Sequence, residues 1–158
     1  MYHVDNNCEN CQIRCGLHAA GRSWRVCIYA VIQLQEEILL VKPSRGGEWT
    51  LPGGMVPVDM LPEEALRDSV LRSTGMELLM RVQPYVRECP HRHHFLVYRE
   101  AAPTAWSMNS ISPEKDPDMI TEWFPVTRLP LKMAQHAKSY LFHERNTHAA
   151  EPALHKVS

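Results

Sequence analysis

Four potential metal ligands stand close together near the start of the chain: Cys8, Cys11, Cys15 and His18. Thiolates and an imidazole at such short spacings can hold one tetrahedral zinc ion and order a short polar segment. Zinc sites usually join two separated halves, and no second Cys-x-x-Cys follows in this sequence. The alternative is a polar N-terminal leader with reduced thiols, since five cysteines without a secretion signal argue against a disulfide framework.

A second group of imidazoles lies in the middle of the chain. His91 and His93 alternate, so they would share one face of an extended strand and could hold a metal ion between them. The alternative is the polar edge of a strand that continues through residues 95–98 into the core. Both interpretations stay open at this point.

The overall composition is that of one soluble globular domain. The chain has 158 residues, of which 44% are hydrophobic and 22% are charged, close to globular averages. The formal net charge of −1 gives no electrostatic footprint for nucleic acid or anionic lipid. The longest apolar run, residues 26–32, is far shorter than the roughly 20 residues that span a bilayer. The first residues show no signal peptide, so we expect a cytoplasmic protein that binds neither nucleic acid nor membrane.

The hydrophobic pattern predicts an α/β (α+β) domain. Residues 24–34 are apolar on both faces, which is typical of a strand in the middle of a sheet. A first helix is predicted from Pro62, which suits the first turn, to Gly75, which suits a left-handed C-terminal cap. A second helix is predicted at residues 131–143. Further strands are predicted at 38–41, 49–51, 78–88, 91–99 and 120–126, with a long loop at 101–117.

The segment that leads into the first helix carries the most specific motif. The chain reads Trp-Thr-Leu-Pro-Gly-Gly at residues 49–54, followed by a loop and by the helix that ends at Gly75. This run resembles the Nudix box, and residues 24–142 resemble the Nudix (MutT-like) family in the order of their elements. The resemblance implies a mixed β-sheet sandwiched between helices. We expect the domain at residues 23–144, after a Cys-rich leader at 1–22. Residues 145–158 show no periodicity, so we expect them to form a disordered tail.

When this sequence is aligned without a gap on the glycines of the Nudix box, it matches the family at backbone and packing positions. It differs from the family at the polar positions. Met60 stands where the family has its first glutamate. Asp68 and Ser69 replace an Arg-Glu pair, and Arg72 and Ser73 replace a Glu-Glu pair. The resemblance therefore describes a degenerate member that lacks the catalytic glutamates.

These departures remove the chemistry that the resemblance implies. In the family, helix carboxylates hold Mg²⁺ or Mn²⁺ against a substrate diphosphate, and a metal-polarised water attacks phosphorus. Positions 69, 72 and 73 share one helical face, where a hard divalent cation needs charged oxygens. This face offers two hydroxyls and a guanidinium, so we expect Arg72 to repel a cation and to pair with Asp68. Acids at residues 114, 116, 118 and 122, where some relatives keep a base, would then have no metal-bound water to activate.

The cleft of the fold can still bind a ligand. Trp49 can stack on a base or belong to the core, and Arg45 can contact a phosphate. Arg72 can offer an anion a bidentate contact in place of the metal. Gly53 and Gly54, in the turn that follows Trp49, are also predicted to bind the ligand. Many relatives are homodimers, so pairing of two copies is a further expectation from the resemblance.

Three functions remain open. The favoured one is a non-hydrolytic Nudix-fold protein that binds a nucleotide-like diphosphate ligand or a protein partner in a regulatory role, without an assigned cofactor. The first alternative is a divergent Mg²⁺- or Mn²⁺-dependent hydrolase of nucleoside diphosphate derivatives, with displaced ligands such as Asp59. The second alternative is a zinc-binding or redox-responsive module built on the N-terminal leader.

Overall fold

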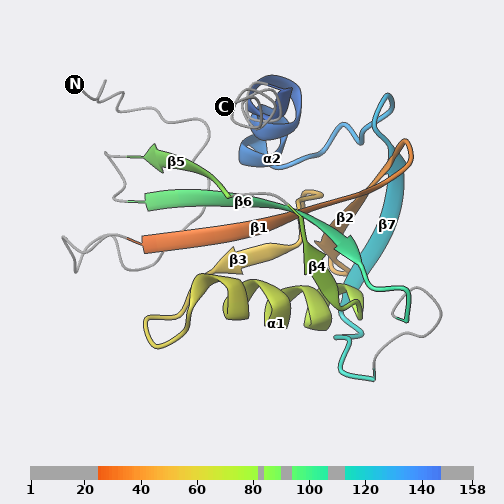
Figure 1. The fold of residues 1–158 in the computed structure, drawn as a ribbon. Helices are drawn as coiled ribbons and strands as arrows, with labels where there is room; N and C mark the ends of the chain where they lie inside the picture. Colours follow the sequence, from red (N-terminus) through yellow and green to blue (C-terminus); the bar gives the residue numbers. More distant parts are fainter. Residues whose placement is uncertain (1–24, 82–83, 90–93, 107–112, 147–158) are drawn as a thin grey trace.

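The computed structural model describes residues 25–81, 84–89, 94–106 and 113–146. Within these ranges the chain forms a mixed sheet of seven strands with helices on both faces (Figure 1). The strands are β1 (Arg25–Leu34), β2 (Glu37–Pro43), β3 (Gly53–Met55), β4 (Leu78–Met80), β5 (Tyr85–Cys89), β6 (His94–Pro103) and β7 (Met119–Pro125). The helices are α1 (Pro62–Thr74), α2 (Gln135–Ser139) and η2 (Tyr140–Glu144), a π-helical turn that continues α2. No helix in the described residues is long and apolar enough to cross a membrane.

β1 is the central strand of the sheet. It pairs in parallel with β6 on one side. On the other side it pairs antiparallel with β3 and, at its end, with β2. β7 lies beside β2, and β4 and β5 share the outer side of β6. Parallel neighbours need a crossover connection, and α1 lies in the connection from β1 to β6, where it covers one face of the sheet (Figure 1).

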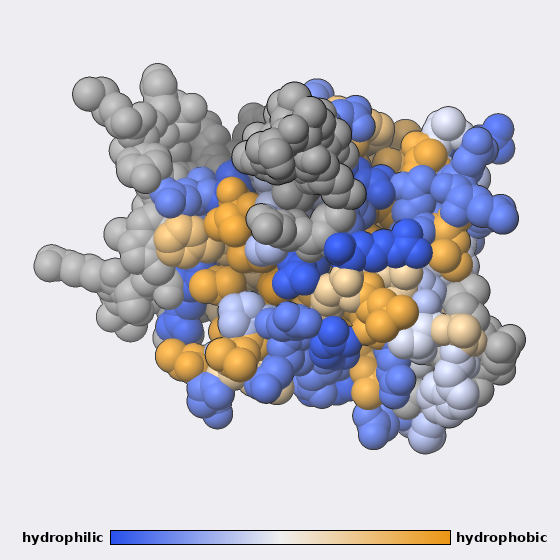
Figure 2. Space-filling model, in the orientation of Figure 1, coloured by the Kyte–Doolittle hydropathy of each residue, from blue (hydrophilic) through white to orange (hydrophobic). Residues whose placement is uncertain are grey.

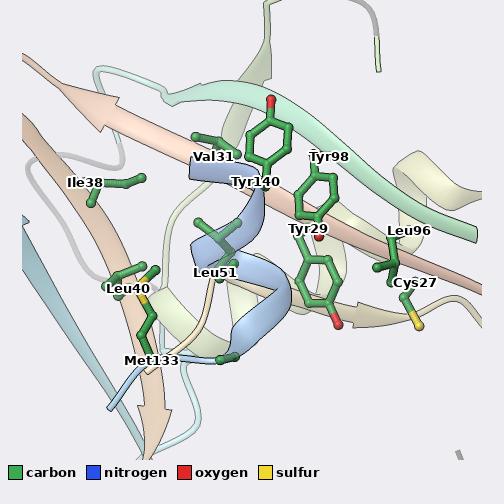
Figure 3. Packing of buried hydrophobic residues seen from close by; sticks show 12 residues of the cluster. Cys27, Tyr29, Val31, Ile38, Leu40, Leu51, Leu96, Tyr98, Met133 and Tyr140 are labelled. Atoms are coloured by element: carbon green, nitrogen blue, oxygen red, sulfur yellow. The ribbon is translucent and has the colours of Figure 1, made fainter. Parts of the chain in front are cut away.

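The two faces of β1 carry the two halves of the core, as its doubly apolar sequence predicts. Tyr29 and Val31 belong to a buried cluster under α2 and η2 (Figure 3). Ile28, which points the other way, belongs to a second cluster that includes Leu66 and Val70 of α1. Both clusters are buried, so α1 and α2 are fixed on opposite faces of one sheet. The predicted α/β sandwich is confirmed.

Two predicted elements near Trp49 are wrong, because this residue bonds to distant parts of the chain. Residues 49–51 form no strand. Thr50 forms an isolated bridge to β2 and Trp49 forms one to Met133, so the two residues do not pair with the same neighbouring strand. The second helix begins at residue 135 rather than 131. The Lys132 carbonyl accepts from the Trp49 N–H, and the Ala134 N–H donates to the Trp49 carbonyl. The Lys132 carbonyl and the Ala134 N–H are therefore already bonded to Trp49, and they are not available to a helix that begins at residue 131.

The boundaries around β6 also differ from the prediction. The predicted loop at 101–117 begins later, because residues 101–103 continue β6 and pair with β4. The predicted strand at 78–88 is divided between β4 and β5, which pair with different parts of β6. Residue Arg145, placed in the predicted disordered tail, is helical, and its guanidinium donates to the Glu100 carboxylate at 2.6 and 3.2 Å. The tail residues 147–158 lie outside the described residues.

α1 begins and ends as its sequence predicts. Pro62 lies in the first turn, and two glutamates follow it near the positive end of the helix dipole. Gly75 caps the other end with a φ of 76°, and its N–H donates to the Leu71 carbonyl at 2.8 Å. A left-handed residue at this position satisfies a carbonyl that the helix end leaves open.

The two glycines before α1 have different structural roles, which gives a direct test of the β1–β3 pairing. Gly53 has a φ of 142°, and a Cβ on it would lie 2.1 Å from the Ile28 carbonyl oxygen of β1. Gly54 has a φ of 159° and no neighbour within 4 Å of such a Cβ. We expect Gly53→Ala to lower the free energy of unfolding by at least about 2 kcal/mol. Gly54→Ala, the matched control, should cost about 1 kcal/mol for the backbone alone; urea unfolding that gave equal costs would contradict the close approach.

Candidate functional site

The face of α1 that resembles a catalytic Nudix helix carries two hydroxyls and a guanidinium. Ser73 is 8% exposed, and its hydroxyl donates to the Ser69 carbonyl at 2.9 Å. Arg72 is exposed and forms an ion pair with Asp68, one turn earlier. The predicted pair of Arg72 and Asp68 is therefore confirmed. The Ser73 and Arg72 side chains both bond within the helix itself.

This donor set does not fit a hard divalent cation. Mg²⁺ and Mn²⁺ take charged and carbonyl oxygens, and residues 69, 72 and 73 supply no carboxylate. Among the residues that the structure describes, no group of three His, Cys, Asp or Glu side chains could hold a metal ion. No step of a metal-dependent hydrolysis can therefore be assigned to residues 69, 72 and 73.

The acids just before α1 and in its first turn form no cluster of three metal ligands among the residues that the structure describes. Met60, at the position of the first glutamate of the box, is half-buried, and Asp59 beside it is exposed. Glu63 forms ion pairs with Arg67 at 3.0 Å and with Arg99 at 3.8 Å. The Glu63 carboxylate therefore links α1 to β6, and its role is structural.

β7 and the segment before it hydrogen-bond to the C-terminal end of α1. The Arg72 carbonyl accepts from the Asp116 N–H at 2.6 Å, and the Ser73 carbonyl accepts from the Thr121 hydroxyl at 2.8 Å. Both bonds satisfy carbonyls that a helix end leaves open. Glu122 pairs in register with a β2 residue of the cluster under α2. Because paired side chains share a face, the Glu122 carboxylate lies on the side of the sheet opposite α1.

The predicted ligand residues are divided between the two faces of the sheet. Trp49 packs against the cluster under α2. Its ring lies edge-on to Phe124 with centroids 4.8 Å apart, and the Lys42 ammonium lies 4.8 Å from the Trp49 ring centroid. Arg72 lies on α1, on the other face, and Arg45 is exposed in the loop after β2. The structure therefore does not bring Trp49 and Arg72 to one ligand.

A residue of α2 that the sequence analysis missed, His136, is buried between this helix and the sheet. His136 is 4% exposed, with Nε2 3.1 Å from the Thr50 hydroxyl and Nδ1 3.3 Å from the Tyr98 hydroxyl. Its ring lies against Tyr29, with centroids 4.2 Å apart. Burial, together with the charge of Arg87, lowers the pKa of His136 to about 4, so the ring is neutral at pH 7. No sequence signal indicates this site, because the two hydroxyls come from residues 86 and 38 positions away.

Three tyrosines extend this buried cluster in a row (Figure 3). The rings of Tyr98 and Tyr140 stack with centroids 4.1 Å apart and an interplanar angle of 11°. The rings of Tyr29 and Tyr98 lie 5.9 Å apart. Burial raises the pKa of all three hydroxyls well above the usual value. The row is therefore uncharged, and it contributes packing under α2 rather than an ionisable group.

Six predicted metal ligands lie outside the described residues: Cys8, Cys11, Cys15, His18, His91 and His93. The structure does not test whether they hold a metal ion. The zinc site of the N-terminal leader therefore stays a prediction.

The fold and the motif together define the class of protein. Two glycines in a short strand lead into a helix that covers one face of a mixed sheet, with a second helix on the opposite face. A family model described as the NUDIX domain matches residues 21–144. The chain belongs to the Nudix family.

Solved structures of Nudix proteins share this fold. A NUDIX hydrolase from Nitrosomonas europaea aligns with 21% identity and a TM-score of 0.60, over 81% of this chain and 90% of that one. A UDP-X diphosphatase aligns with 16% identity and a TM-score of 0.60, over 82% and 66%. An ADP-ribose pyrophosphatase from Streptococcus suis 89-1591 aligns with 18% identity and a TM-score of 0.54, over 72% and 81%. Among curated proteins, no sequence match is found.

Proposed function

We propose that this chain is a Nudix-fold protein that does not hydrolyse diphosphates through a metal on α1, and that it binds a nucleotide-like anion in a regulatory role. The observation that carries the proposal is the α1 face at residues 69, 72 and 73, which offers no carboxylate. A guanidinium on the same face attracts anions and repels cations. We therefore expect this face of α1 to bind an anion, where the family binds a cation.

The ion pair of Arg72 shapes this proposal. The guanidinium is exposed, with a side-chain exposure of 64%, and its partner Asp68 is 42% exposed. An exposed ion pair contributes little stability, typically below about 1 kcal/mol. A phosphate group can therefore replace Asp68 as the partner of Arg72 at a small cost in free energy.

Melting temperatures measured in EDTA test ligand binding without any metal. The panel contains ADP-ribose, UDP-glucose and simple nucleoside diphosphates, because the structural relatives include an ADP-ribose pyrophosphatase and a UDP-X diphosphatase. We expect at least one compound to raise the melting temperature of the wild type and to raise that of Arg72→Gln less, since binding to the folded state stabilises it. No shift across the panel would contradict ligand binding and would favour a protein partner instead.

A divergent hydrolase is the alternative, and the observation that favours it is Asp59. This carboxylate is exposed and stands one residue before the family's first glutamate position. Release of phosphate or nucleotide from the same panel with Mg²⁺ or Mn²⁺ separates the two functions. Turnover that is lost in Asp59→Asn would support the hydrolase and contradict the proposal.

The N-terminal leader gives a third candidate function, a zinc-binding or redox-responsive module. It rests on the spacing of three cysteines and a histidine between residues 8 and 18. Elemental analysis of protein purified without chelator tests it. Zinc near one ion per chain that is lost in Cys8→Ser/Cys11→Ser would support the module, and a metal-free protein would contradict it.

A further inference from the structure

β7 is the last strand at one end of the sheet, and its outer side pairs with no strand among the residues that the structure describes. Its inner side pairs with β2 along its whole length. Figure 1 shows β7 at the outer margin of the sheet, beyond β2. An edge strand presents backbone N–H and carbonyl groups to which a further strand can pair.

The hydrogen bonds at both ends of the β2–β7 ladder show which β7 residues face outward. The Val126 N–H donates to the Glu36 carbonyl at 2.8 Å, and the Ser44 N–H donates to the Asp118 carbonyl at 2.8 Å. Both pairs continue the register of the ladder. Hydrogen-bonded pairs alternate along an antiparallel ladder, so the even-numbered residues of β7 bond to β2. The backbone groups of the odd-numbered residues therefore point to the outer edge.

The chain itself closes both ends of this outer edge. The Met119 N–H donates to the Asp116 carbonyl at 3.2 Å, and the Met119 carbonyl accepts from the Lys115 ammonium at 2.9 Å. At the other end, Pro125 has no N–H, and its carbonyl accepts from the Arg128 N–H at 2.9 Å. A further strand can therefore pair only with the middle of β7.

Thr121 and Trp123 form this open middle part. Within the described part of the chain, no hydrogen bond occupies their outward N–H and carbonyl groups. The edge thus offers two donors and two acceptors on residues two positions apart. One antiparallel strand satisfies all four groups, because each hydrogen-bonded pair of residues exchanges two bonds.

The side chains beside the open edge define what an added strand must carry. Ile120, Glu122 and Phe124 alternate, so they share the face of β7 opposite α1. Ile120 is 37% exposed, Phe124 is half-buried, and Glu122 is exposed and forms no ion pair with any other described residue. Figure 2 shows apolar and hydrophilic surface next to each other on the side of the molecule where β7 lies. An unpaired carboxylate between two apolar side chains favours a strand with a cation between two apolar residues.

From this arrangement we infer that β7 binds an extended segment of a partner protein as an additional antiparallel strand. In this segment a lysine or arginine lies opposite Glu122, and apolar residues lie opposite Ile120 and Phe124. The backbone groups of the edge select a strand, and the Glu122 carboxylate selects its central residue. The inference goes beyond the proposed function, and it does not depend on whether α1 lacks a metal.

A second copy of this chain is the less favoured occupant. The register that satisfies all four groups pairs Thr121 of each copy with Trp123 of the other. The two copies of Glu122 then lie directly opposite each other, and like charges in that position destabilise a strand pair. The same carboxylate that favours a basic segment therefore acts against self-association.

Fluorescence anisotropy with short labelled peptides tests the charge requirement. GSVTKTVSG places a lysine opposite Glu122 with a valine on each side, and GSVTETVSG replaces that lysine by glutamate. We expect the wild type to bind the lysine peptide about tenfold or more tightly than the glutamate peptide. Glu122→Lys should reverse this preference. Glu64→Lys, the matched control, makes the same charge change at an exposed position of α1, and it should keep the preference of the wild type.

N-methylation of the lysine peptide tests the strand pairing itself. In the proposed register both threonine N–H groups donate to β7, whereas the N–H groups of the lysine and of the second valine point away from it. Methyl groups on the two threonine nitrogens should weaken binding about tenfold or more, because both donors are lost. Methyl groups on the lysine and valine nitrogens keep those donors, so they should change the affinity little.

Three results in these experiments would each overturn the inference: no binding of the lysine peptide, equal weakening by the two methylation patterns, or an unchanged preference in Glu122→Lys. Sedimentation of the wild type at pH 7 tests the other occupant. A dimer that the lysine peptide dissociates would show that a second copy holds the edge, and would overturn the assignment to a partner protein. Thermal melts of both variants confirm that they are folded.

Discussion

Glutamates restored at the four degenerate positions of the box are expected to create a divalent-cation site. The variant is Met60→Glu/Ser69→Glu/Arg72→Glu/Ser73→Glu. Three of these carboxylates share the α1 face by their spacing, and the change at residue 72 also removes the repelling guanidinium. We expect Mn²⁺, measured as loss of its free electron paramagnetic signal, to bind about tenfold or more tightly than to the wild type. Hydrolysis of a diphosphate in the panel should appear only in this variant.

The control for this experiment carries glutamine at the same four positions. Glutamine matches glutamate in size and has no charge, so the control changes packing as the test variant does. Ser73 is the critical site, because it is 8% exposed and its hydroxyl bonds to the Ser69 carbonyl. If the glutamine control bound Mn²⁺ as tightly as the glutamate variant, the missing carboxylates would not explain the loss of the site.

The stability of the protein is expected to fall by about 3 kcal/mol between pH 7 and pH 4 through His136 alone. Burial lowers the pKa of this imidazole to about 4 in the folded state, whereas an unfolded chain has an ordinary value near 6.5. The unfolded state therefore binds the proton more readily. The contribution of neutral His136 to the free energy of unfolding is fully present above about pH 6.5, and it is lost as the pH falls toward 4. Urea unfolding at several pH values measures it.

His136→Gln isolates the contribution of the imidazole from that of the carboxylates. Glutamine can still bond to the Thr50 and Tyr98 hydroxyls, which lie 3.1 and 3.3 Å from the imidazole nitrogens. It cannot take up a proton in this range. The difference in unfolding free energy between wild type and variant should shrink as the pH falls from 6.5 to 4. Parallel curves for the two proteins would show that His136 is solvated or already charged.

The parts of the fold that the sequence predicts are those with a local cause. β1 is apolar on both faces, and it is the central strand with a core cluster on each side. Pro62 and Gly75 set the two ends of α1 through their own backbone preferences. The ion pair of Arg72 and Asp68 follows from their separation of one helical turn. Each of these features needs only residues that are close in sequence.

The parts that could not be predicted depend on contacts between distant segments. The backbone of Trp49 bonds to residues 132 and 134. Residues 49–51 therefore do not form the predicted strand, and the second helix begins at residue 135 rather than 131. The packing of Trp49 under α2 also separates it from Arg72, although Trp49 lies just before the box in sequence and Arg72 lies within it. His136 gains its two polar partners only when β6 and the segment at Thr50 meet under α2.

The central claim is that the α1 face of the wild type does not hold a divalent cation, and paramagnetic broadening by Mn²⁺ tests it most directly. Backbone amide signals are recorded while MnCl₂ is added, and the amides of residues 69–73 are the ones to follow. The absence of carboxylates on this face predicts no selective loss of their signals. Selective broadening centred on residues 69–73, reversed by excess Mg²⁺, would contradict the claim.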